Sequence, residues 1–444
     1  MVTRLSDWLT WQETLHPSVI DLGLDRVREV LRRLHWQPPT CPVITIAGTK
    51  GKGSCAALLE SMLSAAGYRT GLFTSPHLQR YNERIRIAQQ DISDESLCSA
   101  FARINTARAD ISLTYFEFNT LAALLTFTTA ELDVWVLEVG MGGRLDAVNV
   151  VDADVAIVTS VGIDHTEWLG DTVERIGREK AGVLRPHRPA LFASAAMPQS
   201  VQTVADELAA VLFRAQRDFG FTADHDQWHW WMNHDSGRIQ LHALPLPGIQ
   251  GAIQIWNASA ALTALHILSA RLPMTRDAID NGLRQVRLPG RFQIITCPTL
   301  PGVEWILDVA HNPMSATILA EHLQVYRRDK GDDGRVVAII GVLADKDLHG
   351  MVLALRDQVD EWITVGLPGA RALSTTLLTE RLLAVNVSVR ATLNNVESAC
   401  EFACQCFKVL GKAPGRILVC GSFMTVAPAL AWLDAAVRRD TLPS

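Results

Sequence analysis

A glycine-rich heptapeptide constrains the fold of this chain more than any other stretch of its sequence. Residues 48–54 read GTKGKGS and directly follow the apolar run at residues 43–47. A buried strand is therefore predicted to enter a tight loop and then a helix. Glycines let backbone N–H groups turn toward an anion, the start of the helix adds partial positive charge, Lys52 adds a full charge, and Ser54 can reach Mg²⁺. The sequence thus predicts a nucleotide phosphate site, with a plain strand-to-helix turn as the alternative.

Short apolar runs recur along the chain, each followed by a polar or glycine-rich break and then by a helical pattern. This arrangement is typical of strands in a parallel sheet that is covered on both faces. The runs form two groups, which are residues 43–47, 134–137 and 155–158, and then residues 303–307, 336–340, 362–365 and 417–419. Ligands bind beyond the carboxyl ends of such strands, where polar residues follow the runs. An α/β fold is predicted, with its chemistry at one edge of each sheet.

The length of the chain indicates more than one domain. Its 444 residues exceed the size at which a single core stops growing, so two or three domains are expected. Proline and glycine at residues 288–290 interrupt the pattern, and a new strand is expected from Phe292. We therefore predict a first domain at residues 1–286, a hinge at 287–291 and a smaller second domain at 292–444.

Residues 224–248 differ in character from both groups of runs. Apolar residues alternate around Gly237, which predicts an antiparallel hairpin appended to the parallel sheet. The segment is rich in histidine, but no regular ligand spacing is present and no carboxylate or thiol pattern completes a metal site. A structural role is therefore predicted for its histidines, His225, His229, His234 and His242.

Charge and cysteine usage narrow the range of partners. The formal net charge is −6, the pI is about 6.1 and the basic residues are scattered, so nucleic acid is not an expected partner. No apolar run reaches the roughly 18 residues of a membrane span, and no secretory signal is evident, so a membrane is not expected either. Eight cysteines without Cys-x-x-Cys spacing suit a reducing compartment, and Cys400, Cys404 and Cys406 are predicted to pack in the core. We expect a cytoplasmic monomer that acts on small molecules.

Three polar residues near the predicted strand ends are candidates for the chemistry. Glu138 ends an apolar run and can hold Mg²⁺, with an ion pair to a neighbour such as Arg144 as the alternative. His165 follows a later strand, and Lys180 lies beside Glu179 in a helical pattern. A lone histidine is usually a hydrogen-bonded structural residue, and a helical lysine beside a glutamate is commonly solvated. These residues alone do not identify a reaction.

Several longer stretches together resemble the folylpolyglutamate synthase family, whose members are relatives of the Mur ligases. In order along the chain they are residues 48–54, 74–78, 137–149, 164–170, 179–182, 289–291, 307–313 and 421–423. Residues 20–25, 110–117 and 143–147 further resemble the bacterial bifunctional members, which combine dihydrofolate synthase and folylpolyglutamate synthase activities. The resemblance runs from about Trp8 to Val426. It implies a phosphate-loop, Mur-ligase-like ATPase domain with a parallel sheet and a small antiparallel element, followed by a smaller Rossmann-like α/β domain.

The resemblance implies an ATP-dependent amide ligase. In both reactions of such enzymes, ATP phosphorylates a carboxylate and the amine of L-glutamate then displaces the phosphate, which releases ADP and phosphate. The first acceptor is 7,8-dihydropteroate and the later acceptors are reduced folates. Phosphate leaves readily whereas carboxylate oxygen does not, so the protein must bring two anions together and spread their charge over metal and lysine.

The resemblance also assigns residues to each part of the site. The ATP site is implied to contain Gly48, Thr49, Gly51, Lys52, Gly53, Ser54, Asn257, Arg291, Asp308 and His311. Two Mg²⁺ sites are implied, with Ser75, Glu138, His165 and a carbamylated Lys180 as ligands, and the last three as the catalytic residues. Carbamylation requires a neutral amine, and therefore a lowered Lys180 pKa. The pteroate or folate site is implied to contain Asp21, Leu22, Gly23, Thr114, Tyr115, Phe116, Glu117, Leu145, Asp146 and Ala147, where Phe116 either stacks a flat ring or packs in the core.

Two departures and several alternatives accompany this assignment. Lys50 stands where the family commonly has asparagine, and residues 297–305 and the tryptophan-rich hairpin match less well. A ligase of peptidoglycan precursors normally carries a further domain before its phosphate loop, for which the 47 residues before Gly48 are too few. A dinucleotide oxidoreductase is disfavoured because no Gly-x-Gly-x-x-Gly follows a strand. Folylpolyglutamate synthase activity alone, or a nucleotide-switch protein without ligase activity, are the alternatives that stay open.

Overall fold

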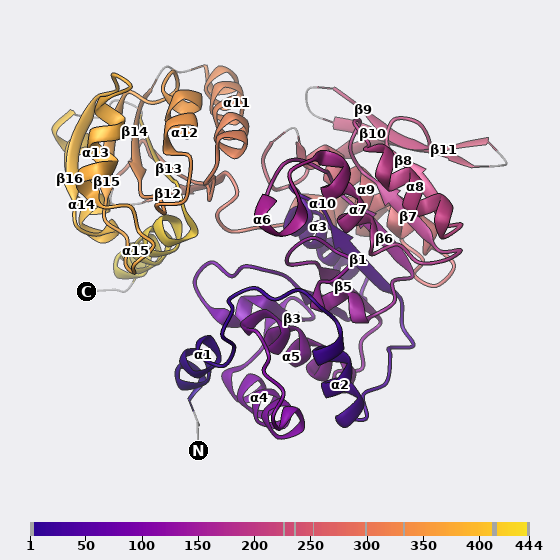
Figure 1. Cartoon of the computed structure of the whole chain (residues 1–444). Helices are drawn as coiled ribbons and strands as arrows, with labels where there is room; N and C mark the ends of the chain where they lie inside the picture. Colours follow the sequence, from indigo (N-terminus) through magenta and orange to yellow (C-terminus); the bar gives the residue numbers. More distant parts are fainter. Residues whose placement is uncertain are drawn as a thin grey trace. The chain divides into compact units, whose positions relative to one another are not determined.

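The two groups of apolar runs form two separate sheets, each within its own unit of the chain (Figure 1). The computed structural model describes residues 4–224, 227–234, 237–251, 253–297, 300–331, 334–410 and 415–441. Unit 1 comprises Met1–Gly248 and Ile253–Arg287, and unit 2 comprises Ile249–Ala252 and Leu288–Ser444. The chain leaves unit 1 after Arg287, inside the segment predicted as a hinge, and the hinge itself stays a prediction.

Unit 1 is built on a largely parallel sheet. In the described part of the chain its strand order is β4-β3-β2-β5-β1-β6-β7-β8. The strands are β1 (Val43–Ala47), β2 (Thr70–Phe73), β3 (Ile85–Ile87), β4 (Gln90–Asp91), β5 (Val134–Glu138), β6 (Val155–Val158), β7 (Pro189–Phe192) and β8 (Val211–Arg214). β1 lies between β5 and β6 and pairs in parallel with both, whereas β3 pairs antiparallel with β2. The central strands are buried along their whole length, which explains why their sequences are continuously apolar.

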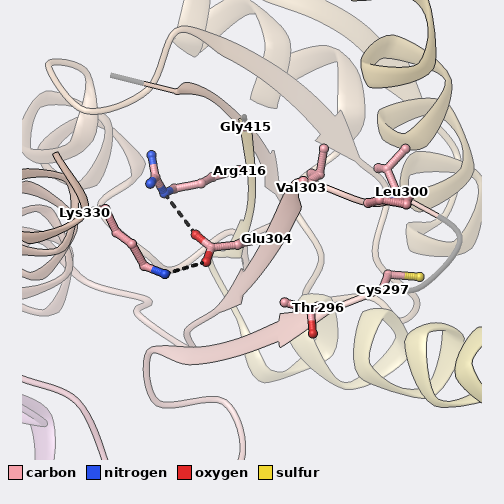
Figure 2. A pocket seen from close by; sticks show the side chains of 10 residues that line it. Thr296, Cys297, Leu300, Val303, Glu304, Lys330, Gly415 and Arg416 are labelled. Carbon is pink, nitrogen blue, oxygen red and sulfur yellow. Dashed lines mark ion pairs between the residues drawn. The ribbon is translucent and has the colours of Figure 1, made fainter. Parts of the chain in front are cut away.

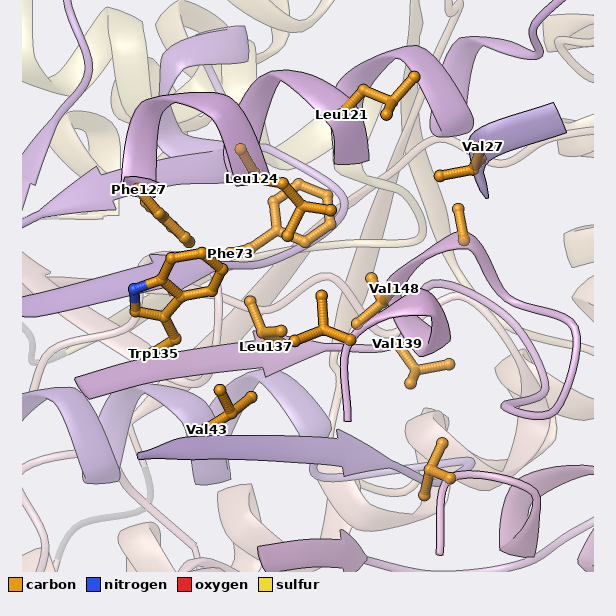
Figure 3. Packing of buried hydrophobic residues seen from close by; sticks show 14 of the residues in the cluster. Val27, Val43, Phe73, Leu121, Leu124, Phe127, Trp135, Leu137, Val139 and Val148 are labelled. Carbon is orange, nitrogen blue, oxygen red and sulfur yellow. The ribbon is translucent and has the colours of Figure 1, made fainter. Parts of the chain in front are cut away.

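The helices of unit 1 pack against this sheet or against one another. They are α1 (Leu5–Glu13), α2 (Asp25–Arg33), α3 (Lys52–Ala65), α4 (Asp94–Arg108), α5 (Tyr115–Thr129), α6 (Thr166–Leu169), α7 (Val173–Ala181), α8 (Gln199–Glu207), α9 (Ile253–Ile267) and α10 (Arg276–Gln285). On one face, Trp135 and Leu137 of β5 pack with Leu124 and Phe127 of α5 (Figure 3). The Trp135 and Phe127 rings meet edge to face, with centroids 5.4 Å apart. α3 and α9 pack against the sheet as well, and α3 is buried along most of its length.

The predicted antiparallel element is a small separate sheet of unit 1. β10 (Gln227–His234) pairs antiparallel with both β9 (Phe219–Ala223) and β11 (Gly237–Pro245). Trp228 and Trp230 are buried, and the Trp230 indole N–H donates to Thr263 Oγ1 of α9 at 3.1 Å. The rings of His229 and His242 meet edge to face, with centroids 5.4 Å apart, while His225 and residues 235–236, where a turn is predicted, lie outside the described residues. The described part of the segment therefore forms the hairpin that the alternation predicts.

Unit 2 has a second sheet, with order β12-β13-β17-β14-β15-β16 in the residues described. Its strands are β12 (Gln293–Thr296), β13 (Val303–Leu307), β14 (Arg335–Ile340), β15 (Glu361–Val365), β16 (Val389–Leu393) and β17 (Gly415–Cys420). Its helices are α11 (Pro313–Lys330), α12 (Leu348–Leu355), α13 (Thr375–Leu383), α14 (Val396–Leu410) and α15 (Phe423–Thr441). All pairs are parallel except β12 with β13. Cys400, Cys404 and Cys406 are buried in α14, so the prediction that they pack in the core is confirmed.

Candidate active site

The glycine loop at residues 48–54 connects β1 to α3, as predicted. Gly51 is the residue before α3 and adopts a left-handed conformation, with φ of 88°. A Cβ atom on Gly51 would lie 2.5 Å from the side-chain oxygen of Asn257, and a Cβ on Gly48 would overlap Thr159 Oγ1. Glycine is therefore required at both positions, by backbone conformation and by space. The same contact brings Asn257, a predicted ATP residue from α9, against the loop.

The loop is fixed to the segment that follows β6. Thr49 N–H donates to the Ser160 carbonyl at 2.9 Å, and Lys50 N–H donates to Ser160 Oγ at 3.0 Å. Thr49 Oγ1 bonds the backbone of Gly162 in both directions, as donor at 3.2 Å and as acceptor at 3.0 Å. The Lys52 ammonium donates to the Gly48 carbonyl at 3.0 Å, so its charge stays within the loop. The stretch that leads to His165 is thus held beside the predicted phosphate site.

Glu138 lies where three predicted elements meet. It ends β5, its residue is 4% exposed, and its Oε2 accepts the backbone N–H of Ser75 at 3.1 Å. A Cβ on Gly53 would lie 3.6 Å from the same oxygen, so the carboxylate also faces the first turn of α3. Arg144 donates to Glu179 at 2.8 Å, whereas the alternative interpretation of Glu138 requires an ion pair between Arg144 and Glu138.

His165 occupies a more open position than Glu138. It immediately precedes α6 in a left-handed conformation, with φ of 50°. Its side chain is 49% exposed, and its Nε2 lies 3.9 Å from Asp164 Oδ1. The hydrogen bonds of Thr49 and Lys50 bring its chain segment to the glycine loop, while its role as a metal ligand stays a prediction.

Lys180 is buried in α7 rather than solvated. The residue is 4% exposed, and its backbone packs against Gly143, where a Cβ would lie 2.9 Å from the Lys180 carbonyl oxygen. Burial, followed by the charge of Lys52, lowers the Lys180 pKa from 10.5 to about 7, although Asp164 and Asp146 act in the opposite direction. The interpretation of Lys180 as an exposed partner of Glu179 is therefore wrong. A substantial fraction of this amine is neutral near pH 7, which is what carbamylation requires.

Asp146 lies close enough to Lys52 and Lys180 for its charge to interact with theirs. Its Oδ2 accepts the Met141 N–H at 2.9 Å and its Oδ1 accepts the Val148 N–H at 3.0 Å. Burial raises the Asp146 pKa to about 7, and the two backbone donors and Lys52 only partly offset that effect. The carboxyl therefore fixes the turn between the β5 end and residues 147–150, with Leu145 half-buried and Ala147 buried beside it.

The remaining predicted acceptor residues gather at the start of α5. Thr114 and Glu117 cap this helix reciprocally, and Tyr115 lies within it beside Tyr81, with ring centroids 5.7 Å apart. The Phe116 ring covers Gly140, where a Cβ would lie 2.5 Å from the ring, and it is 5.9 Å from the Phe73 ring. Asp21, Leu22 and Gly23 lie in the partly exposed segment before α2. Arg26, which the sequence analysis missed, bonds both Asp21 and Glu117.

In unit 2 the predicted nucleotide residues lie at one edge of the sheet, where β13 ends and the antiparallel strand β12 begins. Asp308 follows β13 and accepts backbone N–H groups from Phe292 at 2.9 Å and Ala310 at 2.8 Å. The His311 ring bonds the Val309 carbonyl at 2.8 Å. Both the His311 ring, at 6.3 Å, and the Arg291 guanidinium, at 5.5 Å, lie beside the Phe423 ring. These predicted residues therefore form one cluster within unit 2.

A cavity of about 240 Å³ lies elsewhere in unit 2 (Figure 2). It is found where β13 and β17 begin, at the opposite end of β13 from Asp308. Glu304 occupies its wall and forms ion pairs with Lys330 at 3.3 Å and Arg416 at 3.4 Å. Its lining includes Cys297 and residues 300–304, which belong to the stretch that matches the family less well, and none of the predicted site residues.

The chemistry of the predicted ligands suits a hard divalent cation. Among the residues that the structure describes, no group of three or more His, Cys, Asp or Glu forms a metal site by itself. The predicted set includes only Glu138 and His165 of those types. Its other ligands would be the Ser75 hydroxyl, a Lys180 carbamate and phosphate oxygens, all of which are oxygen donors. A buried carboxylate beside a glycine loop is consistent with that chemistry.

Comparison with known proteins places the chain in a family. Two family models match it, the Mur ligase middle domain over residues 46–265 and the Mur ligase glutamate ligase domain over residues 290–423. The dihydrofolate synthase/folylpolyglutamate synthase of Escherichia coli (strain K12) is 43% identical over 432 residues, which are 97% of this chain and 96% of the relative. The chain belongs to the dihydrofolate synthase/folylpolyglutamate synthase family. The member from Haemophilus influenzae is 39% identical, over 95% of this chain and 96% of its own length.

Solved structures of this family have the same fold. Escherichia coli FolC in complex with DHPP and ADP matches with a TM-score of 0.88 and 42% identity over 99% of both chains. The bifunctional Yersinia pestis member complexed with AMPPNP and Mn ion matches with a TM-score of 0.86 and 43% identity over 98% of both chains. The predicted family and fold class are therefore confirmed. No described helix of the present chain has the length and apolarity needed to cross a membrane.

Proposed function

We propose that this protein is a ligase that uses ATP and a divalent cation to attach L-glutamate to 7,8-dihydropteroate and to reduced folates. The single observation that carries the proposal is the 43% identity, over 97% of the chain, to a dihydrofolate synthase/folylpolyglutamate synthase. An acyl phosphate on the acceptor is the proposed intermediate, and ADP and phosphate are the proposed products. One related structure is in complex with DHPP and ADP, and another has AMPPNP and L-glutamate bound, which supports small-molecule substrates.

We assign the nucleotide to the glycine loop and to the unit 2 cluster. Backbone N–H groups of Gly51, Lys52 and Gly53 start a helix and so favour a phosphate, and Lys52 supplies a cation. Thr49, Ser54 and Asn257 complete the proposed unit 1 contacts, and Arg291, Asp308 and His311 are the proposed unit 2 contacts. The divalent cation, when bound, would neutralise and orient phosphate oxygens. Ser75, Glu138, His165 and carbamylated Lys180 are its proposed ligands.

The chain's own groups would act mainly by positioning and by charge. Lys52 holds positive charge where negative charge develops on the transferred phosphoryl group. Glu138 keeps its carboxylate in place through the Ser75 N–H, which limits the reorganisation needed during reaction. The acceptor would lie along residues 21–23, 114–117 and 145–147, with Phe116 as a stacking surface. This proposed arrangement brings the carboxylate of the acceptor and the nucleotide to the same edge of the unit 1 sheet.

Further features of the proposal concern organisation and setting. We propose domains at residues 1–286 and 292–444 with a hinge at 287–291, which is supported by the change of unit after Arg287. We also propose a cytoplasmic monomer without nucleic-acid or membrane partners. The net charge of −6 and the eight cysteines without Cys-x-x-Cys spacing support this setting.

Phosphate release by the purified protein tests the function. ATP, Mg²⁺ and L-glutamate are supplied with either dihydropteroate or tetrahydrofolate, and phosphate is measured with each acceptor and with neither. Release that depends on both glutamate and an acceptor is expected for each acceptor. Activity with tetrahydrofolate alone would leave only folylpolyglutamate synthase activity, and release independent of glutamate would favour the nucleotide-switch alternative.

A further inference from the structure

Arg26 joins two segments of unit 1 that lie far apart in the sequence. Its Nη1 donates to Asp21 Oδ2 at 2.6 Å and its Nη2 donates to the Asp21 carbonyl at 2.7 Å. Its Nε donates to Glu117 Oε1 at 3.0 Å, across 91 positions of sequence. One guanidinium therefore connects residues 21–23 with residues 114–117, which are two of the three segments assigned to the acceptor site.

The Asp21 segment depends on few other contacts for its position. Residues 14–24 contain neither helix nor strand, and Val19 within them is 89% exposed. His16 Nε2 lies 3.4 Å from Asp21 Oδ2, and the Leu15 carbonyl accepts the Ser112 hydroxyl at 3.1 Å, but neither contact reaches the Asp21 backbone. Arg26 bonds both the side chain and the backbone carbonyl of Asp21, so it restrains the chain at that residue.

The Glu117 end of the connection is rigid. The Glu117 side chain is 4% exposed, and its Oε2 accepts the Thr114 N–H at 2.8 Å. Thr114 Oγ1 accepts the Glu117 N–H at 3.2 Å, which completes the reciprocal cap of α5. The neighbouring residue Phe116 covers Gly140, two residues after Glu138. The anchor point of Arg26 is thus adjacent in sequence to the residue whose ring covers the turn after Glu138.

We propose that Arg26 is a positioning residue for the acceptor, and that it sets the separation between Asp21–Gly23 and Thr114–Glu117. The inference rests on the proposed function. Both segments belong to the stretches that resemble bifunctional members in particular, so the reaction with dihydropteroate should depend on Arg26 more than glutamate addition to folates does. A planar fork with donors to two partners is needed, which a lysine ammonium does not reproduce.

The test compares Arg26→Gln with a matched change on the same helix. Arg32 also donates through Nε and Nη2 to a carboxylate, Glu29, at 2.7 and 2.8 Å, but its side chain is 72% exposed and Arg33 bonds Glu29 as well. For Arg26→Gln we expect the KM for dihydropteroate to rise about tenfold or more, the KM for tetrahydrofolate to rise less, and the KM for ATP to change less than about twofold. Arg32→Gln should leave all three constants unchanged. An equal rise for dihydropteroate and ATP, an equal rise for the two acceptors, or no effect on dihydropteroate would overturn the proposal.

A double-variant cycle separates positioning from direct contact. If Arg26 acts through Asp21, then Arg26→Gln combined with Asp21→Asn should raise the KM for dihydropteroate no more than the stronger single change does. Multiplying effects would show that Arg26 acts on the acceptor independently of Asp21. Arg26→Lys serves if the glutamine variant does not fold, and an unchanged KM in a folded Arg26→Lys protein would equally contradict the need for the fork. Failure of the wild-type protein to use dihydropteroate would instead refute the proposed function.

Discussion

Replacing Lys180 with methionine tests the consequences of burying an amine close to Lys52 of the glycine loop. The folded-state pKa of Lys180 is about 7 and its ordinary value is 10.5. Between those two pH values the unfolded chain binds more protons than the folded protein, so this group makes stability rise with pH across that window. Below pH 7 the destabilisation that comes from burying the charged amine is complete. At about 1.4 kcal/mol per pKa unit, this penalty amounts to roughly 5 kcal/mol. By pH 9 roughly 2 kcal/mol of that penalty is left.

Methionine has similar length and no charge, so Lys180→Met should stabilise the fold while it abolishes ligase activity. The gain in unfolding free energy over wild type should be about 3 kcal/mol larger at pH 6 than at pH 9. Urea denaturation in buffers free of carbon dioxide measures this difference, because dissolved carbon dioxide would add a carbamate to the wild type. Lys408, whose side chain is exposed, provides the control. The free energy of unfolding of Lys408→Met should differ from that of wild type by the same amount at pH 6 and at pH 9. If the difference between Lys180→Met and wild type were also the same at both pH values, the reasoning would be refuted.

Four further variants test other parts of the site. Gly51→Ala should raise the KM for ATP about tenfold or more and cost roughly 1–2 kcal/mol of stability. Gly67→Ala is the control, because Gly67 has the same φ of 88° but no atom within 4 Å of the added Cβ, and it should leave the KM for ATP unchanged. Equal KM values in the two variants would count against the loop assignment. Glu138→Gln keeps an acceptor for the Ser75 N–H but loses the charge, so kcat should fall about 100-fold or more at saturating ATP, and near-normal activity during a Mn²⁺ titration would contradict a metal role. Asp308→Asn offers one acceptor oxygen for two backbone donors, so denaturant unfolding of unit 2 should lose roughly 1–3 kcal/mol, and unaltered stability would show that these bonds contribute little. Lys180→Ala should be nearly inactive but partly restored by a small added carboxylate, and full activity without it would exclude an essential carbamate.

The central strands of both sheets could be predicted because burial on two faces makes their sequences continuously apolar. β1, β6 and β13 have the predicted bounds, and the observed β5 includes Glu138 as its last residue. β2 and β7 were not predicted because both are short, with Gly71 inside β2 and Pro189 as the first residue of β7. β16 was also missed, since its side chains alternate between half-buried and exposed at the edge of the sheet. A continuously apolar run indicates a strand that is buried on both faces, whereas a short or edge strand lacks that signal.

The site could be predicted only where a motif stays contiguous in the sequence. The loop at residues 48–54 is such a motif, and its neighbour Glu138 follows from the parallel order of strands. Lys180 looked like a surface lysine because its environment comes from Gly143 and Asp164, which only the fold brings near. Arg26 gave no signal at all, because its significance lies in a bond to a residue 91 positions away. Long-range polar contacts of this kind require coordinates.

Isotope transfer tests the proposed acyl phosphate most directly. The acceptor carboxylate is labelled with ¹⁸O, the reaction is run with ATP and L-glutamate, and the released phosphate is analysed by mass spectrometry. If the terminal phosphoryl group of ATP is handed to the carboxylate, one labelled oxygen should appear in each phosphate released. Phosphate that carries no label, while amide product accumulates, would contradict the account.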